Sequence, residues 1–288
     1  MKKQNGIKIL ITRFSKIQLL FLLILVYILF YFVEIDETYD ESIKTRSIPK
    51  DGFCVLYNPK YASSVGMNGW PSQDLERDIL QKLPSGYAFI DYIYKINNVS
   101  LSTFHRDVTS SRHIYKTNYP VYTVILYKYD GELLSICPGS NLSYPVVLSR
   151  IVNIDGKSGT TFLFNSDILH AGRINNCEKR EVLQYKVCHK SDLVKLVHLI
   201  GTRIDKTDIC EISYWNLFLR KMSYYFEMPI NYLFYPLMIQ REKQTTIVGK
   251  IQNYIPIQFY TDEHLKWDKP PLAVCLLIHL SVTLPLKI

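Results

Sequence analysis

A histidine and an aspartate two positions apart are the residues of this 288-residue sequence whose types and spacing most directly suggest chemistry. They are His105 and Asp107, in the segment LSTFHRDVTSS at residues 101–111. On an extended strand, residues i and i+2 project to the same side, so an imidazole and a carboxylate at this spacing can bind one cation together. The pair therefore predicts two ligands of a metal site whose third ligand comes from elsewhere in the chain.

A second histidine lies well downstream and is the candidate for that third ligand. Residues 159–172, GTTFLFNSDILHAG, are typical of a strand followed by a turn that presents His170. Two histidines and one carboxylate leave coordination positions open, which is the ligand set of non-haem Fe(II) oxygenases. A His-x-Asp pair alone is weak evidence, because roughly a third of chains with this residue content would contain one by chance.

Simpler explanations are open for each of these residues. His105 and Asp107 can be a solvated loop pair, and His170 can be a structural histidine satisfied by backbone contacts. Arg180 lies ten residues past His170, just before the strand-like run VLQYKV. It also belongs to the charged run at residues 178–181, and such runs usually form solvated surfaces. The surrounding elements therefore have to support a site.

The elements that would position these residues are mostly short strands. Apolar runs separated by turn residues predict strands at residues 52–57, 87–96, 119–129, 133–136, 144–154, 160–164 and 182–187. Asp130-Gly131 is a hairpin signal, and Ser72 is expected to cap a helix at residues 73–83. Successive strands without intervening helices favour a mainly β fold with helical additions, a double-stranded β-helix or jelly roll over residues 51–190.

The two ends of the chain have a different character. Residues 1–16 are basic, and residues 17–33 are apolar over about the minimum length of a membrane span. They predict an uncleaved transmembrane anchor in preference to a cleaved signal peptide, with a cytosolic N-terminus and the catalytic part in the lumen or outside the cell. We expect an acidic linker at residues 34–50 and a helical C-terminal region at residues 191–288.

Charge and cysteine content argue against some classes of protein. Of the formal net charge of +8, five charges come from the first sixteen residues, which leaves +3 for the remainder of the chain. A balance this small is not typical of nucleic-acid binding. The six cysteines form no CxxC pair, so neither a zinc ribbon nor a thioredoxin-type motif is indicated, although disulfides are permitted.

In order and spacing, these motifs resemble the 2-oxoglutarate- and Fe(II)-dependent dioxygenases, particularly the phytanoyl-CoA dioxygenase-like branch. The resemblance covers residues 52–190. It includes YKYDGELLSICPGSN at residues 127–141, which is similar to the family's strand, turn and strand ending in Pro-Gly-Ser-His. Carried over residue by residue, the resemblance implies that His105, Asp107 and His170 bind Fe(II). It implies that Arg180 binds the distal carboxylate of 2-oxoglutarate.

The sequence departs from the family pattern at two points and agrees with it at a third. The family's frequent His-x-Ser is His170-Ala171-Gly172 here, so a hydroxyl that helps to hold the cosubstrate is missing. Arg173 and Lys179 are close enough in sequence to compete with Arg180 for the carboxylate. Asn175 falls where the family often has asparagine.

The resemblance implies hydroxylation, because halogenating members of the family carry a small residue at the position of Asp107. O2 would be consumed, succinate and CO2 released, and ascorbate is a candidate reductant. The substrate would be a protein side chain, ranked first, or a lipid, a glycan or another small molecule, and nucleic acid is disfavoured. Two other functions stay open: a non-catalytic jelly-roll binding module, suggested by the missing hydroxyl, and a structural membrane protein, suggested by residues 17–33.

Overall fold

The computed structural model describes residues 18–25, 37–39, 45–100, 102–144, 149–176 and 178–204, together with the single positions 212, 217, 220, 221, 223 and 224. The chain divides into two compact units, residues 1–37 and residues 38–288. The second unit carries the β core and all of the candidate site residues.

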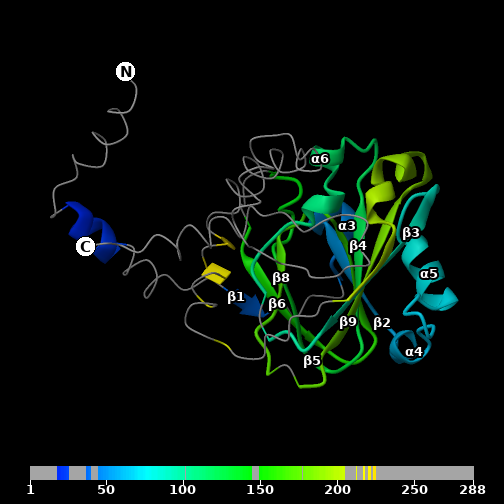
Figure 1. Cartoon of the computed structure of the whole chain (residues 1–288), viewed down its shortest axis with the longest axis horizontal. Coiled ribbons are helices and arrows are strands. Elements are labelled where there is room, and N and C mark those ends of the chain that lie inside the picture. The colour runs from blue at the N-terminus through cyan, green and yellow to red at the C-terminus, as the bar shows by residue number, and fades with distance from the viewer. Residues whose placement is uncertain are drawn as a thin grey trace, which may run out of the picture. The chain divides into compact units, whose positions relative to one another are not determined.

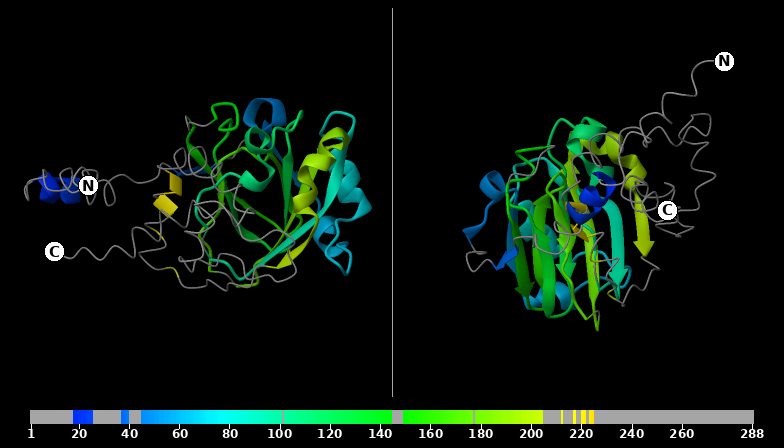
Figure 2. Two further views of the ribbon diagram at one scale, coloured as in Figure 1. Left: turned by 45° about the horizontal axis from the view of Figure 1, so that its top comes forward. Right: turned by 90° about the vertical axis from the view of Figure 1, so that its left-hand side faces the viewer.

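Two β-sheets form this core (Figures 1 and 2). The larger sheet has six strands, in the order β10 (Gly201–Ile204), β3 (Tyr87–Asn97), β9 (Glu181–His189), β4 (Tyr122–Tyr127), β7 (Thr160–Asn165) and β2 (Phe53–Tyr57). The smaller sheet has four, in the order β1 (Glu37–Tyr39), β6 (Ile151–Gly156), β5 (Gly131–Ile136) and β8 (His170–Gly172). The helical segments are α3 (Ile48–Asp51), α4 (Pro59–Ser63), α5 (Gln73–Leu80), η2 (Val108–Ser110), α6 (Arg112–Tyr115) and η3 (Lys190–Leu199).

The chain passes back and forth between the two sheets. It leaves the larger sheet after β4, forms β5 and β6 in the smaller sheet, and returns as β7. It then crosses again as β8 and returns to the larger sheet for β9 and β10. Every pairing among β3, β9, β4 and β7, and between β5 and its two neighbours, is antiparallel. This order is jelly-roll-like, so the predicted fold class is confirmed for the mainly β core.

Period-two alternation along the strands supplies both sides of the larger sheet with apolar residues. One face meets the smaller sheet in a buried cluster that includes Phe53, Ile125, Phe162, Phe164 and Val182. The opposite face meets helix α5 through Leu75 and Ile79, which pack with Tyr185 and Val187. Ser72 caps this helix as predicted, since its hydroxyl accepts a hydrogen bond from the Leu75 amide at 3.3 Å.

All seven predicted strands are present, but three further strands, β1, β8 and β10, were not predicted, and several boundaries differ. Strand β6 begins at Ile151, whereas we expected it from residue 144, and residues 145–148 lie outside the described part. The turn predicted after β7 lies at residues 166–168, and His170 follows it at the start of its own short strand, β8. Strand β8 itself was not predicted, because a three-residue strand is too short for periodicity to identify.

Helices and strands that pack on the β core extend beyond the expected domain limits at residues 51 and 190. Helix α3 begins at Ile48, inside the predicted linker, and packs against β2. Beyond residue 190, η3 is a 3₁₀ helix with a kink at Leu196, and β10 then joins the larger sheet in parallel with β3. The predicted helical region at residues 191–288 therefore contains a strand, and most of its remaining residues lie outside the described part.

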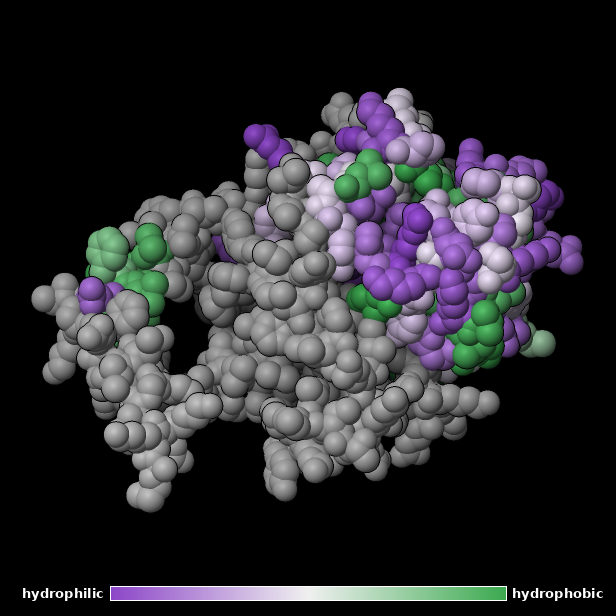
Figure 3. All heavy atoms as spheres, turned by 90° about the horizontal axis from the view of Figure 1, so that it is seen from above, coloured by the Kyte–Doolittle hydropathy of each residue, from purple (hydrophilic) through white to green (hydrophobic). Residues whose placement is uncertain are grey.

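Residues 18–25 form a helix with exposed leucines, and no helix among the described residues is long and apolar enough to cross a bilayer. The rest of the predicted anchor at residues 17–33, and all of residues 1–16, lie outside the described part, so the anchor stays a prediction. Cys54, Cys137 and Cys188 are buried and form no disulfide within the described part of the chain, and the other three cysteines are not described. Where described, the face in Figure 3 is mostly hydrophilic, with small separate apolar patches.

The turn between β6 and β7 depends on a glycine at residue 159. Gly159 has a φ of +90°, and its amide donates to the Tyr127 carbonyl at 2.8 Å. A Cβ at this position would overlap the backbone carbonyl of Asn58, which cannot move as a side chain can. Gly131, in the β4–β5 hairpin, also has a positive φ, of +137°, but a Cβ there would meet nothing within 4 Å.

These two glycines predict a graded loss of stability. We expect Gly131→Ala to lower the free energy of unfolding by about 1–2 kcal/mol, the cost of the positive φ alone. We expect Gly159→Ala to lower it by roughly 2–4 kcal/mol, because backbone overlap adds to that cost. Urea unfolding followed by circular dichroism measures both, and equal losses for the two variants would contradict the close approach of Asn58.

Candidate metal centre

His105 and His170 lie directly opposite each other on neighbouring antiparallel segments. The amide of His105 donates to the carbonyl of His170 at 2.9 Å, and the amide of His170 donates to the carbonyl of His105 at 3.0 Å. Residues that exchange both backbone hydrogen bonds have their side chains on the same face of the sheet. The two rings accordingly lie with their centroids 4.5 Å apart.

Asp107 joins the two histidines as the sequence spacing predicted. Its amide donates to the Ser166 carbonyl at 2.9 Å, which extends the pairing beyond His105. Oδ1 of Asp107 lies 3.8 Å from Nε2 of His105 and 3.8 Å from Nε2 of His170. One ligand atom from each of the three residues falls within 4.8 Å of the others. Atoms that share a cation at about 2.1 Å lie up to about 4.2 Å apart, so a small inward adjustment suffices for these three to bind one ion.

Backbone contacts hold both imidazoles in the orientation that a metal ligand needs. Nδ1 of His105 lies 2.9 Å from the Thr103 carbonyl, and Nδ1 of His170 lies 3.1 Å from the Ile168 carbonyl. A carbonyl can only accept, so each Nδ1 carries the proton and each Nε2 keeps a lone pair. Metal-binding histidines usually donate their second N–H in this way.

The other carboxylate oxygen of Asp107 faces away from the histidines and has two donors of its own. Nζ of Lys186 lies 2.7 Å from Oδ2, and the Thr123 hydroxyl donates to Oδ2 at 2.5 Å. Lys186 is 1% exposed and Thr123 is fully buried. The sequence analysis did not identify Lys186. The available signal was a lysine inside the apolar run VLQYKV. Such a run predicts burial, and a fully buried lysine needs a partner.

Burial and charge together set the protonation states for metal binding. Burial alone would raise the pKa of Asp107, but Lys186, His170 and His105 outweigh it and hold this pKa well below its usual range. Burial lowers the pKa of His170 to about 3, although Asp107 opposes that shift. Near neutral pH the centre therefore presents a carboxylate and a neutral imidazole, the forms that bind a cation.

The cluster is buried on one side and open on the other. His170 is 3% exposed and packs on Phe164, with ring centroids 4.5 Å apart. The side chain of His105 is 38% exposed. A molecule that reaches this centre from solvent therefore approaches on the side of His105.

Arg180 lies beside β8, the strand that carries His170, at the position of Gly172. Gly172 is two positions after His170, about 7 Å along a strand, and faces the same side. A Cβ on Gly172 would lie only 2.9 Å from Nη2 of Arg180, so the missing side chain makes room for the guanidinium. The guanidinium carbon lies 5.5 Å from the centroid of the Tyr127 ring, and Nη1 donates to the Glu132 carbonyl at 3.1 Å.

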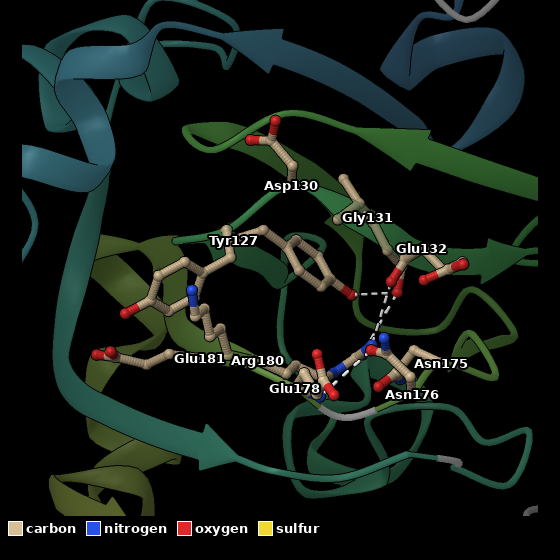
Figure 4. A pocket seen from close by; sticks show the side chains of 12 residues that line it. Tyr127, Asp130, Gly131, Glu132, Asn175, Asn176, Glu178, Arg180 and Glu181 are labelled. Atoms are coloured by element: carbon tan, nitrogen blue, oxygen red, sulfur yellow. Dashed lines mark hydrogen bonds between the residues drawn. The ribbon is translucent and has the colours of Figure 1, made fainter.

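Figure 4 shows this guanidinium beneath Tyr127, in a pocket formed by the β4–β5 hairpin and residues 175, 176 and 178–181. Nε of Arg180 is buried and has no hydrogen-bond partner among the described residues. Arg173, the alternative from the sequence, forms an ion pair with Asp155. The geometry therefore favours Arg180 over Arg173 as the residue that could hold an anion near the centre. Lys179 is exposed and has a φ of +48°.

Asn175 and Asn141 have structural contacts. The buried Asn175 side chain donates to the carbonyls of Val99, Ser100 and Arg173 at 3.1, 3.2 and 2.9 Å, which ties the segment before His105 to the segment after β8. The side chain of Asn141 packs against Gly52. Neither residue belongs to the His–Asp–His cluster.

Comparisons with known proteins reach solved structures only. No family model matches the chain, and no curated protein matches it. EvdMO1 is 12% identical with a TM-score of 0.37, over 51% of this chain and 49% of its own. HygX from Streptomyces hygroscopicus, solved with nickel and 2-oxoglutarate, is 13% identical with a TM-score of 0.37, over 50% of this chain and 84% of its own. The non-haem monooxygenase ThoJ is 13% identical with a TM-score of 0.38, over 51% of this chain and 77% of its own.

The chain thus spans about half the length of EvdMO1. Similarities this low say nothing about what the chain binds or does. Its chemistry has to be argued from the three clustered side chains and their surroundings.

The cluster predicts that the protein binds one divalent transition-metal ion. We expect His170→Ala to weaken the binding of Co(II) by at least about 100-fold, because it removes a ligand outright and loss of a supporting contact alone costs 10–100-fold. His113→Ala is the matched control, since His113 stacks on Tyr144 with centroids 3.9 Å apart, outside the cluster. Titration by calorimetry measures both, and equal affinities for the two variants would contradict the assignment.

Proposed function

We propose that this chain is an Fe(II)- and 2-oxoglutarate-dependent dioxygenase of the phytanoyl-CoA dioxygenase-like branch, and that it hydroxylates its substrate. The observation that carries the proposal is the juxtaposition of Nε2 of His105, Nε2 of His170 and Oδ1 of Asp107 within one small volume. Two nitrogen ligands and one carboxylate oxygen on one side of an ion are typical of non-haem iron oxygenases.

The residues around the cluster fit a short 2-oxo dicarboxylic acid. His105, Asp107 and His170 would hold the metal, and its open positions would face the 2-oxo acid and O2. Arg180 would bind the distal carboxylate, since a guanidinium forms paired hydrogen bonds with a carboxylate. Nε of Arg180 is buried and has no hydrogen-bond partner among the described residues, and such an anion would supply one.

The hydroxyl that is missing after His170 has a nearby replacement. Oγ of Ser102 would lie 3.1 Å from a Cβ at Gly172, and it accepts the Gly172 amide at 2.5 Å. The same hydroxyl donates to the Gly172 carbonyl over a long 3.5 Å contact, which a carboxylate of the cosubstrate would replace. Ser102 and the Arg180 guanidinium thus border the same position, which supports the cosubstrate site despite the departure from the family pattern.

When bound, Fe(II) with 2-oxoglutarate and O2 supplies the oxidation of an unactivated C–H bond, with release of succinate and CO2. The chain's own residues have narrower tasks. The backbone carbonyls of Thr103 and Ile168 orient the imidazoles, and the apolar interior around Phe164 excludes water from the buried side. The partly exposed side chain of His105 leaves the opposite side open to a substrate.

We rank a protein side chain first as the substrate, ahead of a lipid or a glycan, and infer placement on the lumenal or exterior side of a membrane through residues 17–33. This ranking follows the sequence alone. A non-catalytic binding module is the second candidate, favoured by the glycine at position 172.

Succinate release distinguishes these two functions. With Fe(II), ascorbate and 2-oxoglutarate, we expect the protein to form succinate even without its substrate, and His105→Ala to abolish this activity because a metal ligand is lost. Iron binding without succinate would favour the binding module, and absence of iron binding would contradict both functions.

The cosubstrate assignment predicts a change in KM for one arginine only. Arg180→Met removes a charge-assisted pair worth about 1.5–3 kcal/mol, so the KM for 2-oxoglutarate should rise roughly 10–100-fold. Arg173→Met is the matched control, because its guanidinium is already paired with Asp155, and its KM should change by less than about 3-fold. A larger effect from Arg173 than from Arg180 would reverse the assignment.

A further inference from the structure

We propose that Lys186 is a positioning residue that, together with Thr123, restricts Asp107 to one metal-binding oxygen and offsets its charge, so that the centre can accept an anionic 2-oxo acid. The inference rests on the proposed function, since it concerns the same centre. It assigns a role to a buried lysine that neither ligand spacing nor family resemblance indicates.

The two residues act from the larger sheet on a ligand that belongs to the smaller one. Thr123 on β4 is directly paired with Lys186 on β9, so their side chains lie next to each other and face the interior. Asp107 follows the His105–His170 bridge at the edge of the smaller sheet. These contacts therefore join the larger sheet to the ligand-bearing segment beside the smaller one.

The hydrogen bonds leave no ambiguity about donors. Lys186 donates to Oδ2 of Asp107 and to the Thr123 hydroxyl oxygen, both at 2.7 Å. Thr123 has a single proton, and its contact at 2.5 Å directs that proton to Oδ2. Ser166 then donates to the Thr123 oxygen at 3.0 Å. Oδ2 is thereby occupied by two donors, while Oδ1 faces both histidines.

This arrangement has a consequence for coordination. A carboxylate with both oxygens available can bind an ion through either one or both. Because Oδ2 accepts two hydrogen bonds, only Oδ1 is available, and Asp107 takes one coordination position. The positions that a 2-oxo acid and O2 require are then kept open.

The charge of Lys186 has a second consequence. A divalent cation and Asp107 alone carry one net positive charge, and Lys186 adds another. This net positive charge attracts the metal-binding carboxylate of a 2-oxo acid in an interior where an unpaired negative charge is costly to bury. Arg180 acts at the far carboxylate, so the two cations should differ in the ligands whose binding they affect.

A purely structural ion pair between the sheets is the competing explanation, and it predicts lower stability with unchanged coordination. The test uses the full-length protein loaded with Co(II) alone, whose visible absorption reports coordination. 2-Oxoglutarate and 2-oxobutyrate are then titrated separately into the loaded protein. The variants are Lys186→Met, Lys186→Arg, Thr123→Val and Arg180→Met.

Lys195→Met is the matched control. Lys195 also pairs with a fully buried aspartate, Asp192, at 3.1 Å, but that pair lies in η3, away from the centre. This variant should retain the wild-type Co(II) spectrum and the wild-type affinity for both acids.

We expect Lys186→Met to alter the Co(II) spectrum and to weaken both 2-oxo acids by at least about 10-fold, because the change acts at the metal end that the two acids share. Arg180→Met should weaken 2-oxoglutarate alone, since 2-oxobutyrate has no distal carboxylate. Lys186→Arg should restore part of the affinity by returning the charge.

Three results would overturn the proposal. The first two would show a structural ion pair only, and the third would also remove the proposed function. A wild-type spectrum and wild-type affinities in Lys186→Met would show a structural pair only. If that variant does not fold, Thr123→Val removes one donor to Oδ2 without leaving a buried charge, and an unchanged spectrum there would have the same meaning. Failure of the wild-type protein to bind Co(II) would instead remove the proposed function itself.

Discussion

The exchange of two backbone hydrogen bonds between His105 and His170 is the interaction on which the rest of the centre depends. It places two residues far apart in sequence directly opposite each other, with both imidazoles on one face. A shift of the register by one residue would turn one ring to the other side of the sheet, and the cluster would be lost. The same bridge also sets the position of Asp107, two residues further along.

That bridge is itself held by the jelly-roll-like order of strands. Strand β8 is only three residues long, and its register is set by pairing with β5 on one side and with the segment of His105 on the other. The larger sheet then covers the open face, and its apolar residues pack against the smaller sheet. The cluster therefore lies at the margin of a packed interior, where charges interact more strongly than in water.

The low polarity of this interior explains why the centre needs supporting residues from the opposite sheet. An isolated carboxylate is expensive to bury, and Asp107 is 9% exposed. Lys186 and Thr123 satisfy the oxygen that faces away from the histidines, and Ser166 completes the chain of hydrogen bonds. A partly satisfied network would cost more than an apolar core, so these residues are expected to act as one unit.

The sequence by itself determined the features that depend on residues close together in the chain. Apolar runs bounded by turn residues identified seven of the ten described strands, and Ser72 marked the start of α5. The spacing of His105 and Asp107 placed an imidazole and a carboxylate on one side. Strands β1, β8 and β10 escaped prediction, because a short strand or an added edge strand has too little periodicity of its own.

Only the tertiary structure decided which distant residues meet. It brought His170 opposite His105, paired Arg173 with Asp155 while leaving Arg180 beside Gly172, and carried Lys186 across the interior to Asp107. The alternation of residues along a strand predicts on which face of the sheet a side chain lies, but it does not predict which residue of another strand lies opposite. That depends on register and on the packing of two sheets, which are set by contacts between residues far apart in the chain.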